Sequence, residues 1–159
     1  MSDLRTPALL AACLLALLPA RAPAQSPQVA EIEAKLFFTN SGRFSSNVLK
    51  NGEAPGYWNA IIGAGDLEGP VNAVLFIIRV AGKPGDYLQG GKLKVTVREA
   101  GKFVINRNYE PGEFNSAGNS YTAVFIDQVG CSDLAIEARM TAPKPTPPVR
   151  ARVPFSCGE

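Results

Sequence analysis

The stretch KLKVTVREAGKFVINRN, residues 92–108, has the strictest alternation of apolar and polar side chains in the chain. Leu93, Val95 and Val97 occupy every second position. Successive side chains of a strand point to opposite faces, so this pattern predicts a strand with one buried face. Glu99-Ala100-Gly101 then predicts a tight turn, because its final glycine accepts a left-handed backbone. Since Phe103 and Ile105 are expected to resume the apolar face, the stretch predicts a β-hairpin.

Alternation with period two recurs on both sides of this hairpin. In VAEIEAKLFF, residues 29–38, four apolar side chains share one face. The Glu, Ala and Lys content leaves a helix as the alternative there, but strict alternation and the aromatic ending favour a strand. A continuous apolar run over residues 73–80 is typical of a buried central strand. Further strands are expected at 120–128, 134–140 and 149–155, and shorter ones at 44–49 and 57–62.

These segments amount to seven or eight short strands, with no amphipathic helix between them. The pattern predicts an all-β fold, an antiparallel β-sandwich that is immunoglobulin-like in the broad sense. The specific immunoglobulin signature is missing, because no cysteine precedes Trp58 at the expected spacing. A small closed β-barrel is the alternative.

The N-terminal 24 residues have the layout of a secretory signal peptide. Arg5 precedes an unbroken apolar run over residues 8–18, and Ala22-Pro23-Ala24 follows as a small-residue cleavage site. The run is shorter than the roughly 20 residues that a transmembrane helix needs. We therefore expect a signal peptide over residues 1–24 and a single exported domain over residues 25–159, in the periplasm or outside the cell, with no transmembrane span.

One alternative concerns Cys13. Leu10-Ala11-Ala12-Cys13 resembles the motif at which bacterial lipoproteins are cut and lipidated. The apolar run continues behind Cys13, which is atypical of that motif. A lipid-anchored envelope component is therefore an alternative to a freely exported protein.

Loss of the signal peptide leaves two cysteines, Cys131 and Cys157, and an even count in an exported chain predicts a disulfide. The two cysteines enclose the alternating runs 134–140 and 149–155, which predict a hairpin. If Cys131 lay directly opposite Cys157, Ile136 would face the polar Arg152. Either a bulge intervenes, or Cys131 lies outside the ladder, or the two runs are not neighbours.

Composition excludes several kinds of chemistry. The chain has no histidine, the usual general base and transition-metal ligand. It has no phosphate-binding glycine motif. We therefore predict no catalytic residues, no cofactor and no metal site. The formal net charge is +2 and no basic block stands out along the sequence, so nucleic acid is not an expected partner.

Carboxylate chemistry is the catalytic alternative. Asp66 and Glu68 lie together in one turn, and Glu110 and Glu113 in another. Two acids suffice for a glycosidase, so an enzyme acting on saccharides is an alternative function. Asp66 and Glu68 would also suit calcium, although their spacing matches no EF-hand loop.

The stretch GYWNAIIG, residues 56–63, contains the only tryptophan. We expect Trp58 to pack in the sandwich core. The alternative is an aromatic platform of Tyr57 and Trp58 for a sugar or a partner protein, and with Asp66 and Glu68 these residues are the candidate binding surface. We favour an exported, non-catalytic binding or accessory module whose partner is another envelope or extracellular protein, or a glycan.

Overall fold

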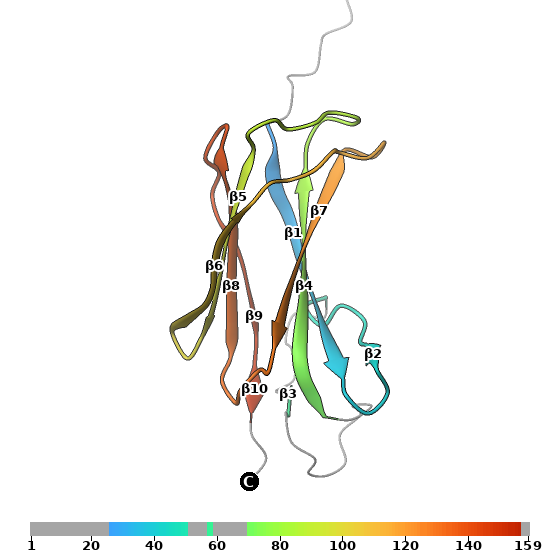
Figure 1. Cartoon of the computed structure of the whole chain (residues 1–159), viewed down its shortest axis with the longest axis vertical. Coiled ribbons are helices and arrows are strands. Elements are labelled where there is room, and N and C mark those ends of the chain that lie inside the picture. Colours follow the sequence, from blue (N-terminus) through green and yellow to red (C-terminus); the bar gives the residue numbers. More distant parts are fainter. Residues whose placement is uncertain (1–25, 51–56, 59–69, 157–159) are drawn as a thin grey trace, which may run out of the picture.

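The computed structural model describes residues 26–50, 57–58 and 70–156, and these form two four-stranded antiparallel sheets that face each other (Figure 1). The all-β sandwich predicted from the sequence is confirmed. The sheets do not close into a barrel, since each keeps two edge strands. The first sheet has the order β2 (Arg43–Phe44), β1 (Gln28–Phe38), β4 (Val71–Ala81), β7 (Asn119–Asp127). The second has the order β6 (Lys102–Tyr109), β5 (Lys92–Glu99), β8 (Leu134–Ala142), β9 (Val149–Val153).

The core lies between the two sheets and is built from the alternating apolar positions. Across it, β1 contacts β8 and β9. Burying one large apolar side chain contributes about 1.5–3 kcal/mol, so this layer is the main source of stability. The largest fully buried side chains come from both sheets and from one loop: Leu36, Phe76, Ile78, Leu93, Phe114, Leu134, Ile136 and Met140.

The β5–β6 hairpin forms at the predicted place, with one difference in register. The two turn residues, Ala100 and Gly101, have φ angles of 46° and 79°, which confirms the left-handed turn. The pairing shifts beside Val97, so that Val104 is an extra residue in β6. This bulge reverses the face of the residues between it and the turn. The expectation that Phe103 shares the apolar face with Ile105 is therefore wrong, and Phe103 is 53% exposed on the outer face.

The β8–β9 hairpin resolves the register question around Cys131. Leu134 pairs with Val153, and Ile136 pairs with Ala151, so apolar residues face apolar residues. Cys131 precedes β8 and lies outside the ladder. The backbone N–H of Phe155 donates to Asp133 Oδ1 at 3.2 Å, which holds the end of the chain beside this loop. Cys157 lies outside the described residues, so its disulfide with Cys131 stays a prediction.

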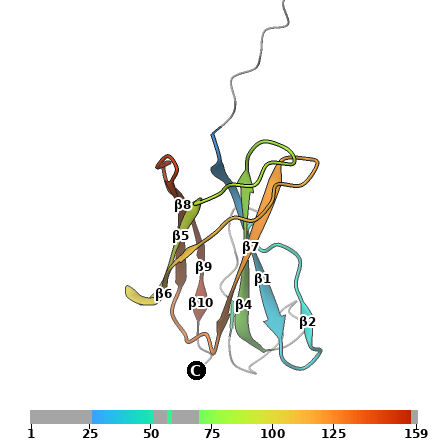
Figure 2. The same cartoon turned by 45° about the horizontal axis from the view of Figure 1, so that its top comes forward.

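Most of the expected strand over residues 44–49 does not form. Only Arg43–Phe44 pairs with β1 as a strand (Figure 2). The chain after β2 bonds that edge through two backbone N–H groups, of Ser45 to Leu36 O and of Val48 to Ala34 O, and through two side chains. Ser45 Oγ accepts the N–H of Leu36 at 2.9 Å, and Asn47 Oδ1 accepts the N–H of Ala34 at 3.1 Å. Serine and asparagine side chains compete with a backbone ladder in this way, which explains the difference from the expected strand.

Only the first two residues of the expected strand over residues 57–62 lie in the described structure, and they form a strand. Tyr57–Trp58 forms β3, which pairs in parallel with β10 (Phe155–Ser156). Residues 59–62 lie outside the described part of the chain, as do the predicted signal peptide, Cys13, Asp66 and Glu68. Within the described residues, no helix is long and apolar enough to cross a membrane.

Candidate anion-binding face

Positive charge is concentrated on the β6-β5-β8-β9 sheet. Its four strands carry eight lysine and arginine side chains but only two acids, Glu99 and Glu137, for a net charge of +6. The strands of the other large sheet carry three basic and three acidic side chains. Because the formal charge of the whole chain is only +2, the excess of positive charge belongs to one sheet.

The outer face of this sheet arises from the same alternation that builds the core. Strands β5, β8 and β9 bury one set of side chains and point the other set to solvent. The outward set contains a single acid, Glu137. We call this outer surface the basic face and define it by five of its cations, which lie in three successive rows: Lys94, Arg98, Arg139, Arg150 and Arg152.

Strand register places these cations in rows across the sheet. In one row, Ala135 lies between Arg98 and Arg152. In the next row, Glu137 lies between Thr96 and Arg150. Because the alanine has only a methyl group, the first row is low in the middle and high on both sides.

A depression of about 650 Å³ lies over these two rows and is open to solvent. Its lining includes Arg98, Phe103, Ala135, Glu137 and Arg152. A second depression, of about 420 Å³, shares Arg98, Ala135 and Arg152 with the first and extends toward Cys131 and Phe155. Together they make a shallow trough floored by alanine and flanked by arginines.

Arg98 and Phe103 form one wall of the trough. The guanidinium carbon of Arg98 lies 3.7 Å from the centroid of the Phe103 ring, a cation–π contact. Nη1 of Arg98 also donates to the carbonyl oxygen of Gly101 at 2.9 Å. This pairing exists because the bulge at Val104 turns Phe103 outward to face Arg98. An arginine has five N–H donors, so a positioned Arg98 still has donors for a ligand.

Arg150 and Arg152 form the opposite wall and are paired with acids. Nε of Arg150 lies 2.8 Å from Glu137 Oε2, and Arg152 forms an ion pair with Asp133. The arginine side chains remain 69% and 71% exposed, respectively. Exposed ion pairs contribute only about 0–1 kcal/mol, so an external anion competes with them at little cost.

Lys94 and Arg139 form the third row, and they pair with each other in register on neighbouring strands. Like charges directly opposite each other destabilise a sheet. No ion pair of either side chain with an acid occurs among the described residues. A bound anion would relieve this repulsion.

Of the four candidate acids, Glu110 and Glu113 lie in the described part of the chain. Glu110 follows β6 and Glu113 makes an isolated bridge with Tyr87; both acids are exposed. Neither lines the two depressions above. Within the described residues, no three or more Cys, Asp or Glu side chains gather as a metal site.

The surface predicted from Tyr57, Trp58, Asp66 and Glu68 is not tested. The backbone of Tyr57 and Trp58 forms β3, but their side chains are not described, and Asp66 and Glu68 lie outside the described residues. Sequence reasoning missed the basic face because its cations alternate with apolar residues and never form a run. The signal was present in KLKVTVR and VRARV, where arginine or lysine fills the outward positions of two predicted strands.

Comparison with known proteins adds no family: no protein-family model matches the chain, and no curated protein matches its sequence.

Proposed function

We propose that the protein is an exported, non-catalytic binding module whose basic face binds an acidic polysaccharide. The observation that carries the proposal is the row structure of that face: five cations and one acid point to solvent from three neighbouring strands. Electrostatic complementarity of this kind raises association rates and selects the sign of the partner's charge.

The spread of the cations favours a polymer over a small anion. From the row of Arg98 to the row of Lys94 the strand advances four residues, about 14 Å at roughly 3.4 Å each. The width from Arg98 on β5 to Arg152 on β9 spans two strand spacings, about 10 Å. These cations do not converge on one point. They suit a chain that repeats its negative charge along its length.

Neutral polar groups beside the cations favour a saccharide as the carrier of that charge. Asn106 pairs with Thr96, and Asn108 pairs with Lys94, so amides and a hydroxyl lie in the same rows as the cations. Amides and hydroxyls both donate and accept hydrogen bonds, as sugar hydroxyls require. Phe103 adds an aromatic ring at the wall of the trough.

A non-catalytic role is supported by the chemistry of the residues. The sequence has no histidine, and the two acids that line the trough, Glu137 and Asp133, are already paired with Arg150 and Arg152. Export, which the N-terminal sequence predicts, supports a partner of the cell envelope or the extracellular space over nucleic acid.

Titration calorimetry of the exported protein with polygalacturonate tests the proposal, with neutral dextran, poly-glutamate and single-stranded DNA as comparisons. We expect binding to polygalacturonate that weakens as salt rises, and none to dextran. The triple variant Lys94→Gln/Arg98→Gln/Arg152→Gln should bind at least tenfold more weakly. Lys35→Gln/Lys50→Gln/Lys83→Gln, which removes three cations away from the basic face, is the matched control and should bind normally.

Three results would contradict the proposal. One is the absence of binding to polygalacturonate at low salt. The second is equal affinity of the triple variant and the unchanged protein. The third is tighter binding of poly-glutamate or DNA than of polygalacturonate, which would assign the face to an acidic protein or to nucleic acid.

A further inference from the structure

The outer edge of β7 is the least protected of the four sheet edges. β2 has two residues, and β9 has five, with two arginines. β6 has a bulge at Val104 and carries Lys102 and Arg107. β7 has nine residues without lysine, arginine or proline, and its register with β4 is unbroken. Charges, bulges, short length and covering loops prevent edge strands from pairing. β7 has these only at its ends, where Asn115 bonds Asn119 and where Asp127 carries a charge, so its centre is unprotected in the described structure.

The surface beside this edge is apolar. On the outer face of β7, Tyr121 is 57% exposed and Phe125 is 49% exposed. Leu75 and Ile77 of β4 lie next to β7 on the same face and are half-buried. An exposed apolar surface along an unpaired strand is typical of a protein–protein contact.

We propose that a second copy of this chain pairs with β7, antiparallel and centred on Ala123. In that register Ala123 faces Ala123 of the second copy, and Tyr121 faces Phe125 of the second copy. The symmetry creates the aromatic pair twice, and aromatic cross-strand pairs stabilise a sheet. Small residues at the centre with aromatic residues on both sides make NSYTAVFID complementary to itself.

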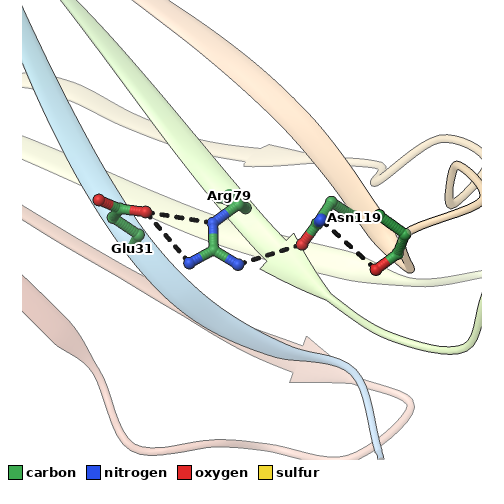
Figure 3. A network of polar contacts seen from close by, with 4 residues as sticks. Glu31, Arg79 and Asn119 are labelled. Carbon is green, nitrogen blue, oxygen red and sulfur yellow. Dashed lines mark hydrogen bonds and ion pairs between the residues drawn. The ribbon is translucent and has the colours of Figure 1, made fainter.

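The N-terminal end of β7 limits the pairing to residues 121–125. The N–H of Asn119 donates to Asn115 Oδ1 at 3.0 Å, and its carbonyl oxygen accepts the N–H of Asn115 at 3.0 Å, so Asn119 cannot also pair with the second copy. Figure 3 shows that Asn119 belongs to a network around Arg79, whose Nη1 donates to Asn119 Oδ1 at 3.1 Å. Nε and Nη2 of Arg79 bind Glu31 Oε2 at 3.2 and 3.1 Å. These contacts occupy the polar groups at this end of β7, so the second copy pairs with the apolar centre of the strand.

The dimer has a consequence for ligand binding, which rests on the proposed function above. The two-fold axis that relates two antiparallel strands of one sheet is perpendicular to that sheet. Both β6-β5-β8-β9 sheets therefore lie on the same side of the joined eight-stranded sheet. Their basic faces point the same way, so one acidic polymer or one polymer-coated surface can engage both copies, with a gain from bivalence.

Sedimentation equilibrium of the exported protein, without polysaccharide, tests the dimer over a series of concentrations. We expect a monomer–dimer equilibrium. Ala123→Lys places two like charges at the symmetry axis and should shift the equilibrium to monomer by at least tenfold. Gln28→Lys adds the same charge to an exposed position of β1 and should leave the dimer unchanged. Thermal unfolding of each variant checks that the fold is retained.

The register is tested by crosslinking with a short thiol-reactive reagent. Ala123→Cys should be linked to itself across the axis, because directly opposed Cβ atoms lie about 4.5–5.5 Å apart. Phe125→Cys should not, because its two copies are four residues out of register, about 14 Å apart. A protein that stays monomeric throughout the series, or a dimer insensitive to Ala123→Lys, overturns the proposal. If the protein dimerises but does not bind polygalacturonate, the proposed function is overturned and the dimer proposal stands.

Discussion

Lys94 and Arg139 lie directly opposite each other on β5 and β8, in the middle two strands of the basic face. A sheet selected for stability alone would have an acid at one of these two positions. The repulsion is typical of a surface on which function and stability conflict. Replacing one of the two cations therefore separates its effect on stability from its effect on ligand binding.

Arg139→Glu should stabilise the fold while weakening the binding of polygalacturonate. The substitution removes a like-charge pair and creates an opposite-charge pair. Each change should stabilise the fold by about 0.2–1 kcal/mol. It also removes a cation and adds an anion in the path of an acidic ligand. Urea unfolding measures the first effect and calorimetric titration the second.

Lys50→Glu, on the exposed loop after β2, makes the same change of charge away from the basic face. It should leave both quantities nearly unchanged. A parallel loss of stability and binding in Arg139→Glu would show that Arg139 supports the sheet instead of a ligand.

Phe76→Ala should be among the most damaging single substitutions in the core. Phe76 is fully buried on the inner face of β4, and truncating such a ring costs about 3–5 kcal/mol. Tyr87→Ala, at a loop residue that is 62% exposed, is the comparison and should cost less than about 1 kcal/mol. Chemical unfolding of both variants measures the difference, and similar costs would contradict the core described here.

Gly118→Ala should destabilise the protein by more than about 3 kcal/mol. Gly118 has a φ of +74°, and a Cβ there would lie 2.5 Å from the carbonyl oxygen of Gly82. The left-handed backbone alone costs a non-glycine residue about 1–2 kcal/mol, and the clash with backbone adds to that. A hydrogen bond holds the two residues close together, since the N–H of Gly82 donates to Gly118 O at 2.8 Å.

Gly90→Ala separates the two contributions. Gly90 has a φ of +70°, but a Cβ there would meet nothing within 4 Å. We expect only the backbone cost, about 1–2 kcal/mol, in the same unfolding experiment. Equal costs for the two substitutions would contradict the close approach of Gly118 to Gly82.

The Cys131–Cys157 disulfide is tested by peptide mapping of the exported protein without reduction. We expect a single linked peptide pair. The double variant Cys131→Ser/Cys157→Ser should lose about 3–4 kcal/mol, because the bridge closes a loop of about 27 residues in the unfolded chain. Free thiols at both positions in the exported protein would contradict the pairing.

Much of the fold was predictable because strand formation is a local property of this chain. In residues 92–99 and 134–140, period-two alternation alone predicts which side chains enter the core, and the structure buries Leu93, Val95 and Ile136. The turn at Gly101 was predictable for the same reason, since left-handed geometry depends on the residue itself.

Expectations failed where a side chain or a bulge altered the backbone pattern. Ser45 and Asn47 bond to β1 and replace the expected strand. Val104 is an extra residue in β6 and moves Phe103 from the core side to the outer face. Neither change can be predicted from the spacing of apolar residues in the sequence, because each depends on the geometry of a partner strand.

The candidate site shows the same division between local pattern and assembly. By itself, the sequence determined an all-β chain with alternating faces and placed a cation at most outward positions of residues 92–98 and 149–153. Only the tertiary structure decided that β5, β8 and β9 are neighbours, so that these cations meet on one surface around Ala135. The physical reason is that alternation sets the face of each side chain within its own strand, whereas strand order and register, set by long-range packing, determine which faces join.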